Sequence, residues 1–440
     1  MIGRFPWDPF PSGAPDPKGP DPLQALVYRA GVSGADAYRS VRMALKRENG
    51  VLRIGNRFVA DGRYRDVAFL AVGHAANSMA LGVLAVLDER VTQGFLAGPD
   101  EVSADIPFRG VRVAPGWGGS EDAVGIAQAS REIAERLGES DLLLLLLSPG
   151  AGRAVLSSPP GMSATELGRT LEEAHARGAS GREVGLLARV LGEAPPDRTL
   201  LPADLRADVE TLVVERGDGA AYVGGGPTIP IRAGERAEAR AVLERVGLLA
   251  TVPPGAAERL RPGAEPPARP RSIRRPVVVA GPPDALRSAA DTTFEKGWTA
   301  RLAALSLRES PAAAADRFLE LTESLVRSET GVVGRGSKGL AALAMLTLDR
   351  PDGTDEGPGL LEFLDRAQAG LRRREMSVGL FRTGGAIGDA SYPPGAVVGA
   401  PSDPDSPADR TGVRALRMPT GITDVGLLAA AVFPRPAGSV

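Results

Sequence analysis

The sequence predicts an α/β protein with two domains, the first a doubly wound and mainly parallel sheet, the second a smaller α/β unit. Three observations support this prediction. The chain has 440 residues, which is more than one domain usually needs. Runs of consecutive aliphatic residues alternate with amphipathic helical stretches, as in parallel sheets covered on both faces. A segment rich in proline and arginine, 253–276, interrupts this alternation and is predicted to be a linker.

The first domain is predicted to span residues 23–252. Its clearest elements are two buried strands, Val67–Val72 and the six-leucine run Leu142–Leu147. A helix expected over 75–89 carries apolar residues three and four positions apart, the spacing of a stripe that faces the core. The other expected elements are a helix over 23–45, a short hairpin over 51–59, a strand over 111–114, and helices over 121–137 and 165–177.

The second domain is predicted to span residues 277–440. It is expected to contain, in order, a strand over 277–280, helices over 284–297 and 311–323, a strand over 325–327, helices over 340–348 and 360–374, a strand over 378–381 and a helix over 425–432. The first 22 residues are rich in proline, glycine and aspartate, so we expect a flexible arm. Its aromatic residues and the arginines of the linker are the expected contact surfaces for a partner.

Composition excludes several classes of protein. A formal net charge of -2 provides no field that would attract nucleic acid or an anionic membrane. The absence of cysteine excludes disulfides, thiolate chemistry and cysteine metal sites. The longest aliphatic run, Leu142–Leu147, is too short to span a bilayer, and the N-terminus lacks the apolar stretch of a signal peptide. We therefore expect a soluble, cytoplasmic protein.

Two glycine-containing turns follow the two buried strands. His74 follows a glycine after the first strand, and Ser148, Gly150 and Arg153 follow the second. Ligands of doubly wound sheets bind where strands end and helices begin, because backbone N–H groups there attract anions. His74 would donate to a phosphate or act as a general base, or else be an ordinary residue of a helical first turn. Pro149 removes one backbone donor from the second turn.

Two further turns are candidate sites. Gly225, Gly226 and Thr228 belong to a Gly-Gly-Gly-Pro-Thr turn, where the glycines serve either the close approach of a ligand or a tight structural turn. Arg335 and Lys338 belong to a basic turn that superficially resembles the end of a phosphate-binding P-loop. Its spacing is wrong and no strand immediately precedes it, so a solvated basic turn is the favoured interpretation.

Several stretches, taken in order, resemble the glycerate 2-kinase family, whose C-terminal part is the MOFRL domain. They are ALVYRAGVSGADAYRSVRMALK, VLRIGNRF, YRDVAFLAVGHAANSMA, LLLLLLSPGAGRAVLSSPPGMSATELGRT and VGGGPTIPIRAGERAEARAVLERVGLL. The resemblance extends over about residues 23–435. It implies two α/β domains with a cleft between them, in which ATP and Mg²⁺ serve to phosphorylate the 2-hydroxyl of D-glycerate.

The chain departs from this family where the family carries its polar site residues. His74 stands where the family has a lysine, which would supply a fixed positive charge. Arg189 is the only cation in the stretch that corresponds to the family's Asn-Thr-Val-Arg-Lys-His. The two aspartates of the family's Gly-Thr-Asp-Gly-x-Asp loop fall on glycines, which leaves Asp389 nearby as a weak metal ligand; a rival alignment supplies Asp355 instead.

The hydrophobic core residues and the structural glycines of the family persist in this chain, whereas the charged and amide side chains of its site are replaced. The sequence therefore favours a family member with a degenerate site. It would be a non-catalytic paralogue that serves as a binding or complex subunit, in a homo- or hetero-oligomer. One alternative is an active kinase of glycerate or a related hydroxy acid, with ATP and Mg²⁺ as cofactors and a rebuilt clamp of His74, Arg153, Arg189, Arg335 and Lys338. Another is a sensor that binds a small molecule without turnover.

Overall fold

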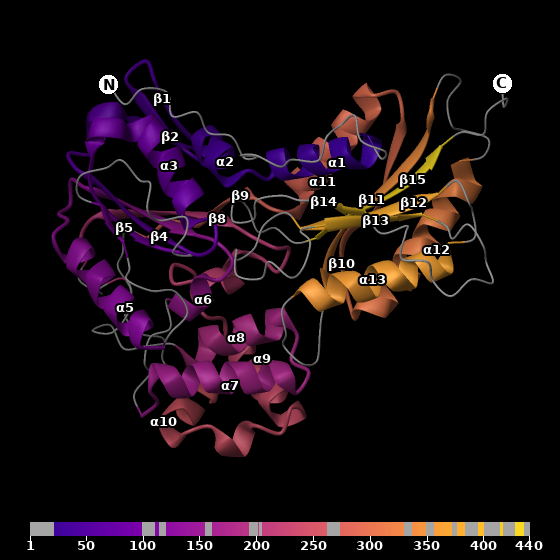
Figure 1. Ribbon diagram of the computed structural model, residues 1–440. Helices are drawn as coiled ribbons and strands as arrows, with labels where there is room; N and C mark the ends of the chain where they lie inside the picture. Colours follow the sequence, from indigo (N-terminus) through magenta and orange to yellow (C-terminus); the bar gives the residue numbers. More distant parts are fainter. Residues whose placement is uncertain are drawn as a thin grey trace. The chain divides into compact units, whose positions relative to one another are not determined.

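The computed structural model describes residues 22–98, 111–113, 120–154, 161–192, 201, 205–261, 273–329, 337–348, 356–371, 376–382, 395–399, 414–416 and 427–434. The chain forms two compact units (Figure 1): the first consists mainly of Ala37–Ala280, and the second combines residues before Ala37 with residues after Ala280. Each unit is built on its own six-stranded sheet covered by helices, which confirms the predicted α/β class.

The sheet of the first unit is entirely parallel, with the strand order β6-β5-β4-β7-β8-β9. Its strands are β4 (Val67–Val72), β5 (Val91–Ala97), β6 (Val111–Val113), β7 (Leu142–Leu147), β8 (Asp208–Val214) and β9 (Val277–Ala280). The chain winds outward from β4 in one direction and from β7 in the other, so the order reverses between these two neighbours. The carboxyl ends of β4 and β7 are therefore the position where a doubly wound sheet binds its ligand.

Helices cover both faces of this sheet, which explains the uninterrupted aliphatic strands. On one face, α5 (Ser120–Glu135) and α6 (Ala151–Ala154) pack on the side chains of alternate strand residues such as Leu70 and Leu145. On the other face lie α2 (Ala37–Ala44) and α3 (Ala76–Leu87), with α3 against β4, β5 and β7. Every leucine of β7 is buried as a result.

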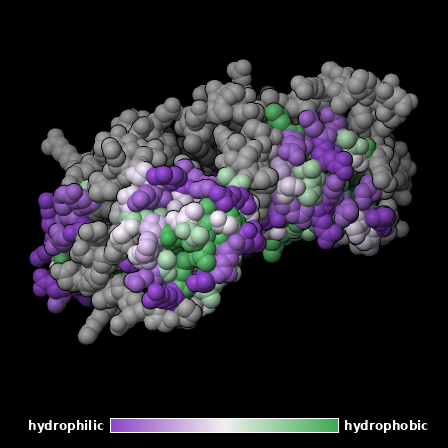
Figure 2. All heavy atoms as spheres, turned by 90° about the horizontal axis from the view of Figure 1, so that it is seen from below, coloured by the Kyte–Doolittle hydropathy of each residue, from purple (hydrophilic) through white to green (hydrophobic). Residues whose placement is uncertain are grey.

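The first unit also contains a helical layer with its own hydrophobic core. It is made of α7 (Ala164–Ala176), α8 (Gly181–Leu191), α9 (Ala233–Arg245) and the short α10 (Pro254–Ala257). Ser163 and Ser180 begin α7 and α8 with capping boxes, in which the serine side chain and a glutamate three residues later satisfy reciprocal backbone N–H groups. Seen from below (Figure 2), hydrophilic side chains surround a smaller apolar area on this layer. A separate antiparallel meander comprises β1 (Leu45–Glu48), β2 (Val51–Ile54) and β3 (Arg57–Ala60).

The sheet of the second unit is mixed, with the order β10-β11-β15-β12-β13-β14. Only β10 and β11 run parallel to each other, and the other neighbours are antiparallel. Its strands are β10 (Thr299–Glu309), β11 (Gly339–Leu348), β12 (Ser377–Arg382), β13 (Gly395–Gly399), β14 (Arg414–Leu416) and β15 (Leu427–Pro434). Helices α12 (Pro311–Glu329) and α13 (Glu356–Gly370) share a core with this sheet, while α1 (Pro22–Gly34) and α11 (Pro282–Glu295) pack together and contact β15 and β11.

The units differ from the predicted domains of residues 23–252 and 277–440. Helix α1 belongs to the second unit: the Gln24 amide donates to the carbonyl oxygen of Ala430 at 3.0 Å, and Tyr28 stacks on Phe381 with 4.8 Å between ring centroids. At the other boundary, β9 is an edge strand of the first sheet and does not open the second unit. The start of the predicted linker is ordered, since α10 and the buried Leu260 pack into the helical layer.

Three predicted elements of the second domain were wrong. The segments 340–348 and 425–432 were expected to be helices, but 340–348 lies in β11 and the described part of the second segment, 427–432, lies in β15. The segment 325–327 lies inside α12. Both misassigned strands are rich in alanine and leucine and are buried on both faces, so they show no alternation. A continuous apolar run does not distinguish a buried strand from a buried helix by periodicity.

The stacking of α1 on the second sheet predicts a large stability difference between two phenylalanines of that unit. Phe381→Ala should lower the free energy of unfolding by about 3–5 kcal/mol, because it leaves a cavity beneath Tyr28. Phe294→Ala, at a side chain that is 75% exposed, should change it by about 0.5 kcal/mol or less. Urea denaturation followed by circular dichroism measures both variants, and equal effects would contradict this packing.

Candidate functional site

The turns after β4 and β7 meet at the reversal point of the first sheet. The Ser148 N–H donates to the carbonyl oxygen of Val72 at 3.0 Å, and the His74 N–H donates to that of Pro149 at 2.8 Å. The structure thus brings together three of the predicted site residues: His74, Ser148 and Gly150. We call these joined turns, 73–75 and 148–150, the switch-point turns.

Two glycines allow the switch-point turns to approach each other so closely. Gly73 has a φ of 121°, and a Cβ atom there would lie 2.2 Å from the hydroxyl oxygen of Ser148. Gly150 has a φ of 85°, and a Cβ atom there would lie 2.7 Å from Nε2 of His74. The imidazole ring therefore lies directly over Gly150. Both glycines are required by space as well as by backbone conformation.

The hydroxyl group of Ser148 is buried and bonded within the protein. It accepts the N–H of Ala75 at 3.0 Å and lies 3.4 Å from the carbonyl oxygen of Val72, to which it donates. The residue that precedes α3, Ala75, has no capping side chain of its own, so Ser148 satisfies a donor at this helix start.

The backbone N–H groups of the switch-point turn at residues 73–75 are likewise hydrogen-bonded within the protein. The Gly73 N–H donates to the carbonyl oxygen of Ala97 at 3.0 Å, and the Ala76 N–H to that of Gly73 at 3.1 Å. Together with His74 and Ala75, four consecutive N–H groups are bonded to protein oxygens. In this arrangement the turn does not fit a phosphate group, which would need those donors.

Two polar residues of α3 were missed by the sequence prediction. Asn77 and Ser78 are buried in the first turn of the helix, directly after the switch-point turn. Among the described residues, Oδ1 of Asn77 and Oγ of Ser78 have no hydrogen-bond partner. The available signal was a pair of polar residues inside an otherwise apolar helix. They are uncharged polar groups, and a buried polar atom without a partner is an exception in folded proteins.

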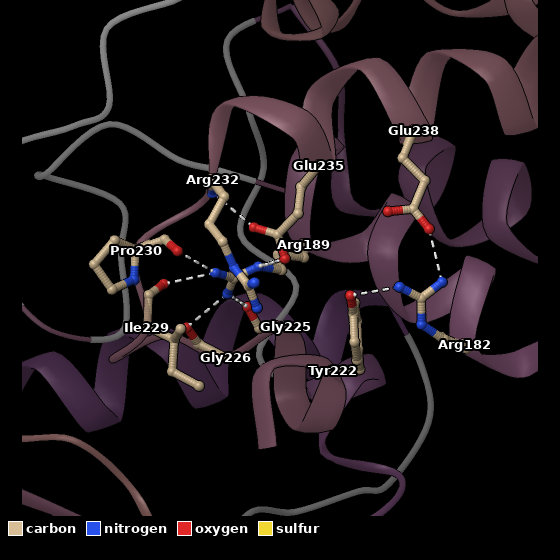
Figure 3. A network of polar contacts seen from close by, with 10 residues as sticks. All are labelled: Arg182, Arg189, Tyr222, Gly225, Gly226, Ile229, Pro230, Arg232, Glu235 and Glu238. Atoms are coloured by element: carbon tan, nitrogen blue, oxygen red, sulfur yellow. Dashed lines mark hydrogen bonds and ion pairs between the residues drawn. The ribbon is translucent and has the colours of Figure 1, made fainter. Parts of the chain in front are cut away.

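Arg189 is buried against the glycine turn rather than in an open site (Figure 3). Its side chain is 1% exposed and forms an ion pair with Glu235, with Nε and Oε1 3.4 Å apart. Its two terminal nitrogens donate at 2.7–3.0 Å to four backbone carbonyl oxygens, those of Gly225, Gly226, Ile229 and Pro230. The guanidinium expected to bind substrate therefore holds the turn in place.

The glycine turn is rigidly defined by these contacts. Gly224, Gly225 and Gly226 have φ values of 59°, 70° and 57°, a left-handed run that side-chain-bearing residues avoid. Thr228 accepts a hydrogen bond from the hydroxyl of Thr211 on β8 at 3.1 Å. The structure thus groups Arg189, Gly225 and Gly226 and ties Thr228 to the end of the turn.

Of the remaining predicted site residues, the structure describes Lys338 and the backbone of Arg153. Lys338 is exposed in the second unit, where its N–H donates to the carbonyl oxygen of Gly297 at 2.8 Å. Arg153 lies in α6. Arg335, Asp355 and Asp389 lie outside the described residues. Within the described ranges, no group of three or more histidine, aspartate or glutamate residues is placed to hold a metal ion.

A second ionisable cluster lies at the opposite, amino ends of the strands. Arg57 of the meander pairs with Glu210 and with Asp208, and the Tyr64 hydroxyl donates to Asp208 at 2.8 Å. Burial, and then the hydrogen bond to Asp208, raise the pKa of Tyr64 to about 12. Burial also raises the pKa of Glu210, although Arg57 opposes this shift. These contacts fasten the meander to β8.

The architecture is that of a known class of two-unit α/β proteins. A glycerate kinase from Thermotoga maritima superposes with a TM-score of 0.68 at 20% identity, over 94% of this chain and 100% of that one. The PH0495 protein from Pyrococcus horikoshii OT3 superposes with a TM-score of 0.67 at 17% identity, over 94% and 98%. At these identities the likeness shows a shared fold.

Sequence comparison identifies the family. Residues 24–261, more than half of the chain, match the family described as a domain of unknown function, DUF4147. The chain therefore belongs to this family, the glycerate kinase-type family that its sequence resembles. A curated relative, the glycerate kinase of Rattus norvegicus, is 29% identical over 174 residues. That match spans 36% of this chain and about a third, 33%, of the relative. In the described part of the chain, no helix is both long and apolar enough to cross a membrane.

The packing of the switch-point turns predicts that Gly73 tolerates no side chain. Gly73→Ala should lower the free energy of unfolding by about 3 kcal/mol or more, from the backbone strain and the clash with Ser148. The control is Gly152→Ala in α6, where a Cβ atom would meet nothing within 4 Å and should stabilise the helix by about 0.5–1 kcal/mol. Thermal or urea unfolding of the two variants measures the difference; a tolerated Gly73→Ala would show that the turns are not so closely joined.

The contacts of Arg189 predict a structural defect when it is removed. Arg189→Ala should lower the free energy of unfolding by about 3–5 kcal/mol, because it strands a buried carboxylate and four carbonyl groups. Arg182 of the same helix is the matched control: its ion pair with Glu238 joins side chains that are 42% and 40% exposed. Arg182→Ala should cost about 1 kcal/mol or less. Similar losses for both arginines in urea unfolding would argue against the role assigned to Arg189.

Proposed function

We propose that this protein is a non-catalytic member of its family that acts as a binding or complex subunit in the cytoplasm, with the second unit as a MOFRL-like domain. One observation carries the proposal. The N–H groups of residues 73–76, in the turn that leads into α3, are bonded to the protein's own oxygens, one of them to the hydroxyl of Ser148. Phosphoryl transfer depends on donors and cations that meet the transferring group.

The identity of the side chains supports the same proposal. His74, at the position of the family's lysine, lies over Gly150 and supplies no fixed positive charge. Arg189, the one cation left in its stretch, is committed to the glycine turn and Glu235. What the site retains near α3 is neutral and polar, in Asn77 and Ser78. Such neutral groups supply no charge for the phosphates of ATP.

ATP binding separates this proposal from the active kinase. We expect no change in melting temperature with ATP, Mg²⁺ and D-glycerate, because a ligand that binds only the native state must raise it. The Thermotoga maritima glycerate kinase serves as the positive control under the same conditions. We also expect His74→Lys to gain neither ATP binding nor kinase activity, since one lysine does not replace the missing site carboxylates.

Stabilisation of the protein by ATP and Mg²⁺ would contradict the proposal. If ATP and Mg²⁺ stabilise the wild-type protein, and His74→Ala removes that effect while Lys46→Ala on the meander does not, the site is a rebuilt kinase site. The proposal of a non-catalytic subunit would then be rejected in favour of phosphorylation of a small hydroxy acid. Isothermal titration calorimetry of the same variants provides the confirming measurement.

A further inference from the structure

Strand β10 forms one end of the second sheet. It has 11 residues, Thr299–Glu309, and among the described residues it pairs with β11 alone. The segment from Leu302 to Leu307 (LAALSL) contains neither charge nor proline. Charges, prolines and β-bulges are the usual means by which a protein prevents an edge strand from pairing with another chain, and the middle of β10 has two register irregularities but no charge or proline.

The middle of β10 also exposes apolar side chains. Leu302 is 46% exposed and Leu305 is 58% exposed, two of the most exposed large apolar residues in the described part of the chain. Leu305 falls in the second of two register shifts with β11, between Ala304 and Leu307. An edge strand with outward leucines offers both backbone hydrogen-bonding groups and apolar surface to a partner strand.

The charges at the two ends of β10 identify the partner. β10 carries three charged residues, Arg301, Arg308 and Glu309. Arg301 lies opposite Ala342 of β11 and Glu309 lies opposite Leu348, so this oppositely charged pair is symmetric about the position of Met345. Because their partners are six residues apart on β11, both lie on the same face of the sheet. If a second β10 pairs antiparallel about this midpoint, Arg301 of each copy lies opposite Glu309 of the other. Opposite charges placed in this way stabilise cross-strand pairs.

We propose that β10 pairs antiparallel with β10 of a second copy of this chain, forming a two-fold dimer with Leu305 near the axis and an Arg301–Glu309 pair at each end. Such an isologous interface is self-complementary by symmetry. It joins the two second sheets into one continuous sheet. The proposal does not depend on what the switch-point turns bind, because β10 belongs to the other unit.

Charge reversal tests the register of this dimer. Wild-type protein should sediment as a dimer that dissociates on dilution in analytical ultracentrifugation. Arg301→Glu alone, or Glu309→Arg alone, sets like charges opposite each other and should raise the dissociation constant about tenfold or more. The double variant Arg301→Glu with Glu309→Arg should restore the wild-type dimer. A double variant no better than the single ones would overturn the proposed pairing.

Cysteine cross-linking tests the position of the axis. The chain has no cysteine, so Leu305→Cys introduces a single thiol that should form an intermolecular disulfide on mild oxidation. Phe58→Cys is the control, at a side chain that is 69% exposed in the first unit, and should remain monomeric on a non-reducing gel. Leu305→Lys should abolish the dimer while leaving the circular dichroism spectrum unchanged. A monomeric wild-type protein at all concentrations would overturn the proposal and leave a strand of a different protein as the occupant of this edge.

Discussion

The contact between the turns that follow β4 and β7 is the constraint on which the first unit depends. Its central bond joins the Ser148 hydroxyl to the N–H of Ala75, and it forms only because Gly73 lets the two backbones approach. The contact fixes where α3 begins, where His74 lies and how the two halves of the doubly wound sheet adjoin. A binding site at this point has a precise scaffold but few unoccupied donors.

The glycine turn near α8 is also held by polar groups that bond within the protein. A buried arginine is costly unless its donors are used, and Arg189 meets this condition through carbonyl groups and Glu235. Ser148 and Arg189, which the sequence suggests as ligand-binding residues, form hydrogen bonds that stabilise the fold. The serine and the arginine therefore contribute to stability at the places where relatives of this fold are expected to contribute to chemistry.

Sequence reasoning succeeded where one local pattern had one physical meaning. The leucines of β7 and the apolar strand β4 were located correctly, because a short aliphatic run between turn residues is typical of a buried strand. It failed for β11 and β15, whose alanine-rich runs suit a helix equally well until α1, α11, α12 and α13 cover them. At the site, the sequence placed His74 and Gly150 in turns that follow buried strands, but their proximity depends on the pairing of β4 with β7. The satisfied donors of Ser148 and Arg189 likewise depend on distances that no sequence pattern contains.

The place of α1 has a consequence for how the protein is made. This helix is synthesised before the first unit, whereas its contacts, Phe381 and Ala430, follow that unit in the chain. The first unit, by contrast, is continuous from Ala37 to Ala280 and can fold while synthesis proceeds. Folding of the first unit can therefore be complete before that of the second unit. Gln24 and Tyr28 find their partners only after β15 and β12 are synthesised. A nascent chain of this protein therefore carries α1 uncovered from its synthesis until β12 and β15 follow, which is a period when chaperone binding would be of most use.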